Sequence, residues 1–376
     1  MSSVPLSGAG SSARLTFMQR HLHLDGQLMT ALILLSGVGL LILYSASGED
    51  MGELQRQVFR LGLAFTLMVL VAQVSPDQLR RWTPWLFLAG LSMLMLVLMV
   101  GVVGKGAQRW LDLGLFRFQP AELMKLAIPM MVAWFISRRD LPPNLFQVAV
   151  ALALIAVPTA LIVLQPDLGT AVLVCASGFF VIFLAGLRWR IMLFATALIA
   201  AMAPIFWHFL MHDYQKRRIL TLLDPERDPL GSGYHIIQST IAIGSGGLYG
   251  KGWLNGTQSR LEFLPERNTD FIFAVFSEEF GLVGVIQLLV LYLFIIGRGM
   301  YIAIQAQDTY SRLLAGSLAL TFFVYVFVNV GMVSGLVPVV GLPLPLISYG
   351  GTSMVTLMVA FGILMSVHTH RKLWAS

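Results

Sequence analysis

Residues 313–370 read LLAGSLALTFFVYVFVNVGMVSGLVPVVGLPLPLISYGGTSMVTLMVAFGILMSVHTH and contain no Asp, Glu, Lys or Arg. A soluble domain would have to expose part of such a run to water, whereas the hydrocarbon core of a bilayer accommodates it. Over all 376 residues only 12% are charged, against roughly 25% in soluble proteins. The chain is therefore predicted to be an all-α integral membrane protein.

Ten apolar segments are long enough to span a bilayer, and charges or turn residues bracket each of them. They lie near 27–47, 57–75, 82–103, 120–137, 144–165, 168–187, 191–211, 271–297, 312–336 and 348–369. This pattern predicts about ten transmembrane helices in a domain over 27–369. Short segments, 1–26 and 370–376, are expected to flank the domain, and a large extracytoplasmic loop, 212–269, to join helices seven and eight.

Arginine pairs fix the expected orientation, because short cytoplasmic loops are enriched in Lys and Arg. The pairs stand in alternate gaps between spans, at 80 and 81, 138 and 139, 188 and 190, and 298 and 312. Both termini are therefore expected in the cytoplasm. The net charge of +6 arises from these clusters, and no basic run with interleaved aromatics is present, so no nucleic-acid partner is expected.

A short loop on the opposite side breaks the charge rule. It carries Lys105, Arg109 and Arg117. Because short external loops are normally poor in cations, these side chains are expected to serve an anionic ligand. Trp110, beside Arg109, is either part of such a site or an aromatic of the membrane interface.

The long loop carries a second cationic cluster, Lys216, Arg217 and Arg218, and a glycine-rich turn over 244–247. Gly250-Lys251 suggests a nucleotide-binding P-loop, but Ser245 and Gly252 occupy positions that the P-loop motif reserves for Gly and Ser or Thr. We therefore interpret the glycines as a place where backbone passes close to backbone.

Asp270 stands where this loop re-enters the membrane, directly before an apolar run. An ionisable group at membrane depth is costly and is commonly functional. An aspartate before a helix can equally be an N-cap, and the two roles are compatible. Glu122 and Lys125 are spaced i,i+3 and are expected to pair on one helix face. Glu278 and Glu279 are expected to include an ion pair with a cation on another helix.

Four separated motifs give the chain a recognisable pattern. They are GLPLPLISYGGTS at 341–353, PERNTDFIFA with EEFGLVG at 265–274 and 278–284, residues 106–125, and QPDLGT at 165–170. Together these motifs resemble the SEDS family (shape, elongation, division and sporulation proteins). Chain length, short tails and the Pro-Glu-Arg form of the second motif resemble the rod-shape members more than the division members.

The resemblance implies a peptidoglycan glycosyltransferase of the bacterial inner membrane. Such enzymes polymerise lipid II into β-1,4-linked glycan, release undecaprenyl diphosphate, and work with a class B penicillin-binding protein in the elongation complex. By the same resemblance, Asp270 matches an essential aspartate, Trp110 a functional tryptophan, and Glu122 with Lys125 a charged pair of the cavity.

The predicted reaction needs a base for the acceptor hydroxyl and cations for the departing diphosphate. Asp270 is the expected base. The expected diphosphate ligands are Arg267, Lys105, Arg109 and Lys216, Arg217 and Arg218. No dedicated set of metal ligands is visible, although Mg²⁺ or Mn²⁺ could accompany the diphosphate.

Two other functions are open on sequence alone. A lipid II flippase would need the same groove and cations but no base at the membrane edge, and a scaffold would need neither. A transpeptidase partner with a single span is expected to pack on helices 312–336 and 348–369, which carry no formal charge and several small residues.

Overall fold

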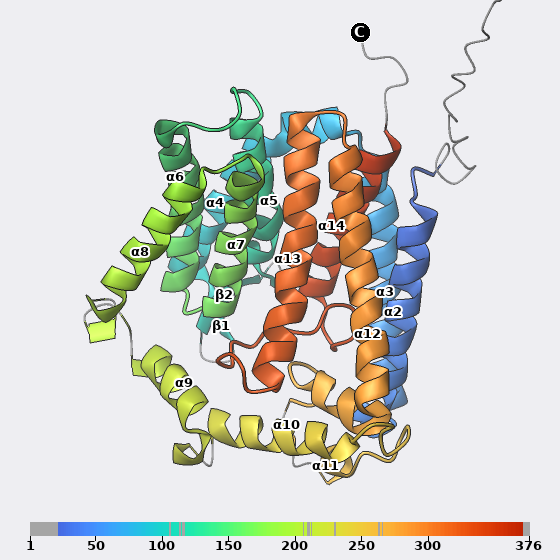
Figure 1. Ribbon diagram of the computed structural model, residues 1–376. Helices are drawn as coiled ribbons and strands as arrows, with labels where there is room; N and C mark the ends of the chain where they lie inside the picture. The colour runs from blue at the N-terminus through green and yellow to red at the C-terminus, as the bar shows by residue number, and fades with distance from the viewer. Residues whose placement is uncertain are drawn as a thin grey trace, which may run out of the picture.

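The computed structural model describes residues 22–104, 107–112, 114, 117–205, 207–208, 211, 213–228, 231–261, 264 and 266–370. A bundle of long helices dominates the described chain (Figure 1). Its members are α2 (Gly26–Ala46), α3 (Met51–Ala72), α4 (Pro76–Val100), α5 (Pro120–Ile136), α6 (Leu145–Leu164), α7 (Leu168–Leu184), α8 (Trp189–Ile205), α12 (Ile272–Gln305), α13 (Thr309–Val333) and α14 (Thr352–Thr369). Each overlaps one predicted span, which confirms the fold prediction. Among the described helices, seven are long and apolar enough to cross a membrane by length and composition.

Three helix boundaries differ clearly from the predicted ones. Helix α4 begins at Pro76 rather than near 82, because Ser75 and Gln78 form a capping box at its start. Helix α3 begins at Met51 rather than near 57, because the Asp50 carboxylate caps it by accepting from the Gly52 amide at 2.7 Å. Helix α12 continues to Gln305 rather than ending near 297. Arg298 does not end it, because its guanidinium pairs with Asp25 at 2.6 Å and is largely buried.

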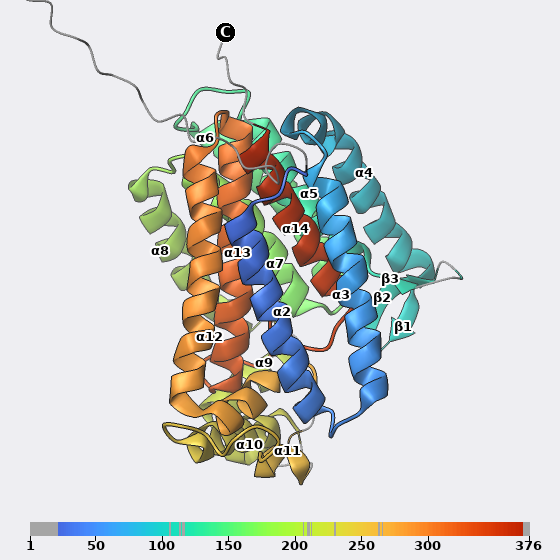
Figure 2. The ribbon, with the colours of Figure 1, turned by 90° about the vertical axis from the view of Figure 1, so that its right-hand side faces the viewer.

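Short elements close one end of the bundle (Figures 1 and 2). They are helices α9 (Asp213–Leu223), α10 (Ser232–Gly246) and α11 (Thr257–Arg260), with a 3₁₀ turn, η2 (Pro225–Arg227), before α10. The last residues of α14 lie at the opposite end (Figure 1). The long loop is therefore a folded layer over the bundle.

The short basic loop forms a small antiparallel sheet, where the sequence predicted no strand. Its strands are β1 (Val102–Gly104), β2 (Ala107–Asp112) and β3 (Arg117–Phe118), in the order β1-β2-β3. In this sheet, Trp110 pairs with Val102, and Leu111 pairs with Phe118. The sheet leads directly into α5 and so places Arg109 and Trp110 beside the start of that helix.

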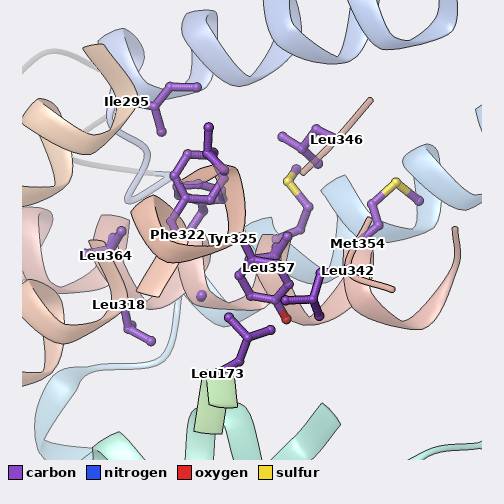
Figure 3. Close-up of a cluster of buried hydrophobic side chains, with 14 of the residues drawn as sticks. Leu173, Ile295, Leu318, Phe322, Tyr325, Leu342, Leu346, Met354, Leu357 and Leu364 are labelled. Carbon is purple, nitrogen blue, oxygen red and sulfur yellow. The ribbon is translucent and has the colours of Figure 1, made fainter. Parts of the chain in front are cut away.

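The segment between α13 and α14 lies inside the bundle rather than over it. Leu342 and Leu346 pack with Tyr325 and Leu357 in a buried apolar cluster (Figure 3). Ile347 is fully buried. This segment, residues 334–351, carries the proline-rich motif and reaches the core from the end closed by α9–α11.

Residues 244–246, predicted to form a turn, are the last residues of helix α10. The glycines that follow α10 pack against a break in α12, as predicted for close backbone approach. At Gly281 the α12 backbone leaves the helical region with φ +62°. The Lys251 and Gly252 amides donate to the Glu278 and Glu279 carbonyls, both at 3.0 Å. A side chain at Gly250 would collide with the Glu279 carbonyl. Glycine is required here because two backbones touch.

Candidate active site

Asp270 lies at the base of α12 without occupying its capping position. The N-cap of α12 is Phe271, and that end has no side-chain cap. The Asp270 main-chain oxygen accepts from Asn329 Nδ2 at 2.9 Å, and the same amide donates to the Leu342 carbonyl at 2.7 Å. Asn329 is fully buried on α13. It therefore ties Asp270 to the proline-rich motif, and the N-cap interpretation of Asp270 is wrong.

A glycine lies against the Asp270 carboxylate. Gly341 has φ +75°, and a Cβ added there would stand 3.4 Å from Asp270 Oδ2. Such a left-handed backbone disfavours any residue with a side chain. The half-buried carboxylate thus lies directly against the chain of the proline-rich motif.

Main-chain bonds fasten the two motifs to each other. The Tyr349 amide donates to the Asn268 carbonyl at 2.8 Å, and Ser348 Oγ donates to the Thr269 carbonyl at 2.6 Å. Ser348 Oγ also accepts from the Leu344 amide at 2.7 Å. Because the groups bonded on the Asp270 side are the Asn268 and Thr269 carbonyls, these bonds fix the path of the backbone that enters Asp270.

A polar hollow of about 450 Å³ opens beside this clamp. It is lined by Glu53, Leu264, Glu266, Arg267, Asn268, Thr269 and Tyr349. Arg267 is half-buried in its wall. A carboxylate, a guanidinium and open space therefore occur together at this end of α12.

Two arginines of α3 join this region and were not among the residues named from sequence. Arg56 Nε donates to Tyr349 Oη at 3.3 Å, and the Arg60 guanidinium lies over the Tyr349 ring at 4.6 Å. They are spaced i,i+4 and share a helix face. The available signal was a pair of arginines within a span, since such charges seldom face lipid.

The Glu122–Lys125 pair is buried in α5. Lys125 Nζ lies 2.7 Å from Glu122 Oε1, and both side chains are less than one-tenth exposed. Lys125 also lies 5.2 Å from the centre of the Tyr325 ring on α13. The predicted i,i+3 pairing is confirmed. A buried pair of this kind is costly to break from one side.

Arg109 holds the turn between α6 and α7. Its Nη2 donates to the Pro166 carbonyl at 2.7 Å, and its Nη1 lies 3.8 Å from Asp167 Oδ1. Asp167 caps α7 through the Thr170 amide and accepts from Gln119 at 2.8 Å. The Arg109 guanidinium is thus bound to groups of the protein itself, which the sequence did not indicate.

The remaining predicted cations lie apart from the clamp or outside the described residues. Lys216, Arg217 and Arg218 stand on α9, which packs mainly on α10 and the 3₁₀ turn. Lys105 lies outside the described residues. A role for α9 in binding diphosphate therefore remains a prediction.

Glu278 and Glu279 are sealed away from the hollow. Glu278 Oε1 accepts from Lys251 Nζ at 2.7 Å and from the Thr257 amide at 2.9 Å, and Glu279 accepts from Ser45 Oγ. The expected ion pair exists, but its cation lies in the outer layer and not on another spanning helix. These carboxylates anchor that layer to α12.

Helix α10 contacts the start of α12 through an aromatic stack. The His235 ring lies 5.4 Å from the Phe271 ring at an interplanar angle of 19°. Burial lowers the pKa of His235, although Glu266 and Asp228 act to raise it. The folded outer layer thus reaches the residue that follows Asp270.

Comparisons with known proteins cover nearly the whole chain. A family model described as "Cell cycle protein" (FtsW, RodA, SpoVE) matches residues 26–373. The chain is 56% identical to peptidoglycan glycosyltransferase MrdB of Escherichia coli over 351 residues, covering 93% of this chain and 95% of that protein. It is 35% identical to stage V sporulation protein E of Bacillus subtilis over 360 residues, 93% of this chain and 98% of that protein.

Solved structures agree with the sequence matches. A chain from a study of how a peptidoglycan synthase complex coordinates polymerization and crosslinking aligns with a TM-score of 0.81 at 35% identity, covering 93% of this chain and 99% of that one. The rod shape determining protein RodA of Thermus thermophilus aligns with a TM-score of 0.70 at 30% identity, covering 93% and 98%. The chain belongs to the FtsW/RodA/SpoVE family of membrane proteins.

Proposed function

We propose that this protein polymerises lipid II into β-1,4-linked peptidoglycan strands during cell elongation, with Asp270 as the catalytic base. The chain is a peptidoglycan glycosyltransferase, like the MrdB protein to which it is 56% identical. The observation that carries the assignment of the base is the position of Asp270. Its backbone is clamped by Asn329, its carboxyl group is half-buried, and it directly follows Arg267, Asn268 and Thr269, which line a polar hollow.

The reaction proposed is a direct displacement at the anomeric carbon. Asp270 takes the proton of the acceptor hydroxyl as that oxygen bonds to C1 of the donor sugar. The bond from C1 to the diphosphate oxygen breaks, and undecaprenyl diphosphate leaves with the electron pair. A positioned base contributes typically 10²–10⁴-fold to such a step.

Cations of the hollow are proposed to bind the diphosphate as its charge develops. Arg267 lines the hollow, and Arg56 and Arg60 flank Tyr349 in its wall. Guanidinium groups suit this role because they bind phosphate oxygens in pairs. Trp110, Glu122 and Lys125 are not among the residues that line this hollow, and their role in the reaction stays a prediction from the family resemblance.

The described residues hold no group of three or more His, Cys, Asp or Glu able to bind a metal. Any Mg²⁺ or Mn²⁺ in the reaction would then be held largely by the diphosphate. Adding EDTA to the polymerisation assay tests whether the reaction needs a divalent ion. A requirement restored by either ion would show that the cation takes part.

Polymerisation by purified protein separates this function from a flippase. Lipid II is the only substrate, and glycan length is measured on gels. Asp270→Asn keeps the size of the side chain but cannot take a proton, so we expect glycan synthesis to fall at least 10²-fold. Asp213→Asn, at an exposed aspartate of α9, is the matched control and should retain normal synthesis. Long glycan made by Asp270→Asn at the normal rate would exclude it as the base.

The partner is proposed to be a class B penicillin-binding protein whose single span packs on α12 and α13. An apolar groove of about 300 Å³ runs between these helices, with Leu289 and Leu293 on one wall and Phe323 and Phe327 on the other. The second helix expected from sequence, α14, contributes no residue to this groove. A photo-crosslinker at Leu293 should form an adduct with the partner. Adducts formed only from crosslinkers on another face of the bundle would show that the partner does not bind at this groove.

The orientation proposed is the one the arginines predict, in the bacterial inner membrane with both termini cytoplasmic. The outer layer of α9–α11 and the hollow then face the cell exterior or periplasm, where peptidoglycan is assembled. This placement is consistent with a base at the external membrane edge.

A further inference from the structure

A second hollow lies at the other end of the bundle. It has a volume of about 320 Å³ and is lined by Asp77, Arg80, Arg81 and Arg138. Three cations and one anion give its wall a net charge of +2. The first three residues belong to the start of α4, and Arg138 follows α5. The polymerisation site proposed above makes no use of this hollow.

The arginines of this hollow differ from Arg298, which lies at the same end of the bundle. Arg298 is neutralised by Asp25 at 2.6 Å. None of the ion pairs found between described residues involves Arg80, Arg81 or Arg138. The Arg138 guanidinium is instead stacked on the Trp134 ring at 3.7 Å, which limits its freedom while leaving its charge unpaired. The charge rule for loops explains cations here, but it does not explain three of them around one hollow.

Large apolar side chains that follow the hollow's arginines on α4 are exposed. On α4, directly after the two arginines, Trp82 is 51% exposed, Trp85 74% and Leu88 54%. Tryptophans prefer the headgroup level of a membrane. A ligand in the hollow therefore has a polar end among guanidinium groups and an apolar surface running away along α4.

We propose that this hollow binds the phosphate of an anionic phospholipid, with the acyl chains lying along Trp85 and Leu88. Arginine forks match phosphate oxygens, and basic pockets between spanning helices bind lipid headgroups of this kind. The exposed apolar strip favours a lipid over free phosphate, because only a lipid has acyl chains that can lie along the strip.

Lipid binding to the full-length protein in detergent tests the proposal. Phosphatidylglycerol or phosphatidylcholine is added, and bound lipid is counted by native mass spectrometry. Arg80→Gln/Arg138→Gln is compared with Arg190→Gln, an exposed arginine at the same end of the bundle. Each lost contact with an anionic headgroup should weaken binding about fivefold. We expect the double variant to lose most of its preference for phosphatidylglycerol, and Arg190→Gln to keep it.

Three results would overturn the proposal. They are equal binding of both lipids by the wild-type protein, an unchanged preference in the double variant, and displacement of phosphatidylglycerol by inorganic phosphate at similar concentration. The last result would assign the hollow to a soluble anion. Lipid II polymerisation serves as the folding control for every variant, and Arg81→Gln repeats the test if the double variant fails that control.

Discussion

Replacing Asn329 by leucine tests whether the clamp on Asp270 matters for catalysis. The change keeps the approximate size of the side chain but removes both donors, at 2.9 Å to the Asp270 carbonyl and 2.7 Å to the Leu342 carbonyl. Leaving a buried carbonyl without its donor costs about 1–3 kcal/mol, and interhelical bonds in membranes average nearer 0.6 kcal/mol. We therefore expect about 1–3 kcal/mol of lost stability in total.

The effect on rate should exceed the effect on stability. A shift of about 1 Å in a catalytic group can cost roughly 10²-fold in rate. We expect lipid II polymerisation to fall 10- to 100-fold, and the thermal unfolding midpoint in detergent to fall by only a few degrees.

Ser317→Ala is the matched control for this prediction. The buried Ser317 Oγ donates to the Ser177 carbonyl at 2.6 Å, so its loss removes a similar bond between α13 and α7. It should lower the midpoint comparably and leave polymerisation near normal. Normal polymerisation by Asn329→Leu, or an equal loss in Ser317→Ala, would refute the positioning argument.

Other predictions use the same purified protein. Lys125→Met leaves Glu122 buried without its cation and should lower the stability of the protein by about 3–5 kcal/mol. Adding Glu122→Gln should recover much of that loss, as measured by the thermal unfolding midpoints of both variants. Because burial lowers the pKa of His235, the unfolded state binds its proton more readily, so stability should decline as pH falls through about 6.5. His235→Gln should flatten that decline, and an unchanged pH profile would contradict it. In a cysteine-free background, Asn255→Cys should react with a membrane-impermeant thiol reagent on intact spheroplasts, and Gln305→Cys should not. The reverse result would show that the proposed orientation in the membrane is wrong.

Hydropathy was sufficient to locate the spans, because a helix in lipid must be apolar over a fixed length. It failed where a polar group is satisfied by a distant partner. The end of α12 was misplaced because Arg298 looks like a helix end until Asp25 is seen beside it. The small sheet was missed because strands of two to six residues leave little pattern in sequence.

The candidate site was predictable only in part, for a similar reason. Asp270 stands out locally, since it is ionisable and enters an apolar run. Arg56 does not, because its contact with Tyr349 joins residues 293 positions apart. Arg109 was expected to face a ligand, but its bond to the Pro166 carbonyl depends on a turn far along the chain. Contacts of this kind follow from packing and not from spacing.

The carboxylates around the outer end of α12 differ in what they can do, and the difference narrows the choice of base. Glu278 and Glu279 are at most 1% exposed and are occupied by donors from the outer layer or from α2, so a sugar hydroxyl cannot reach them. Glu53 lines the hollow from the first turn of α3, and its Oε2 accepts from Asn268 at 2.8 Å. Glu266 is exposed there and accepts from Thr269 Oγ1 at 2.8 Å. Asp270 combines partial exposure with a clamped backbone, which is the arrangement a positioned base needs.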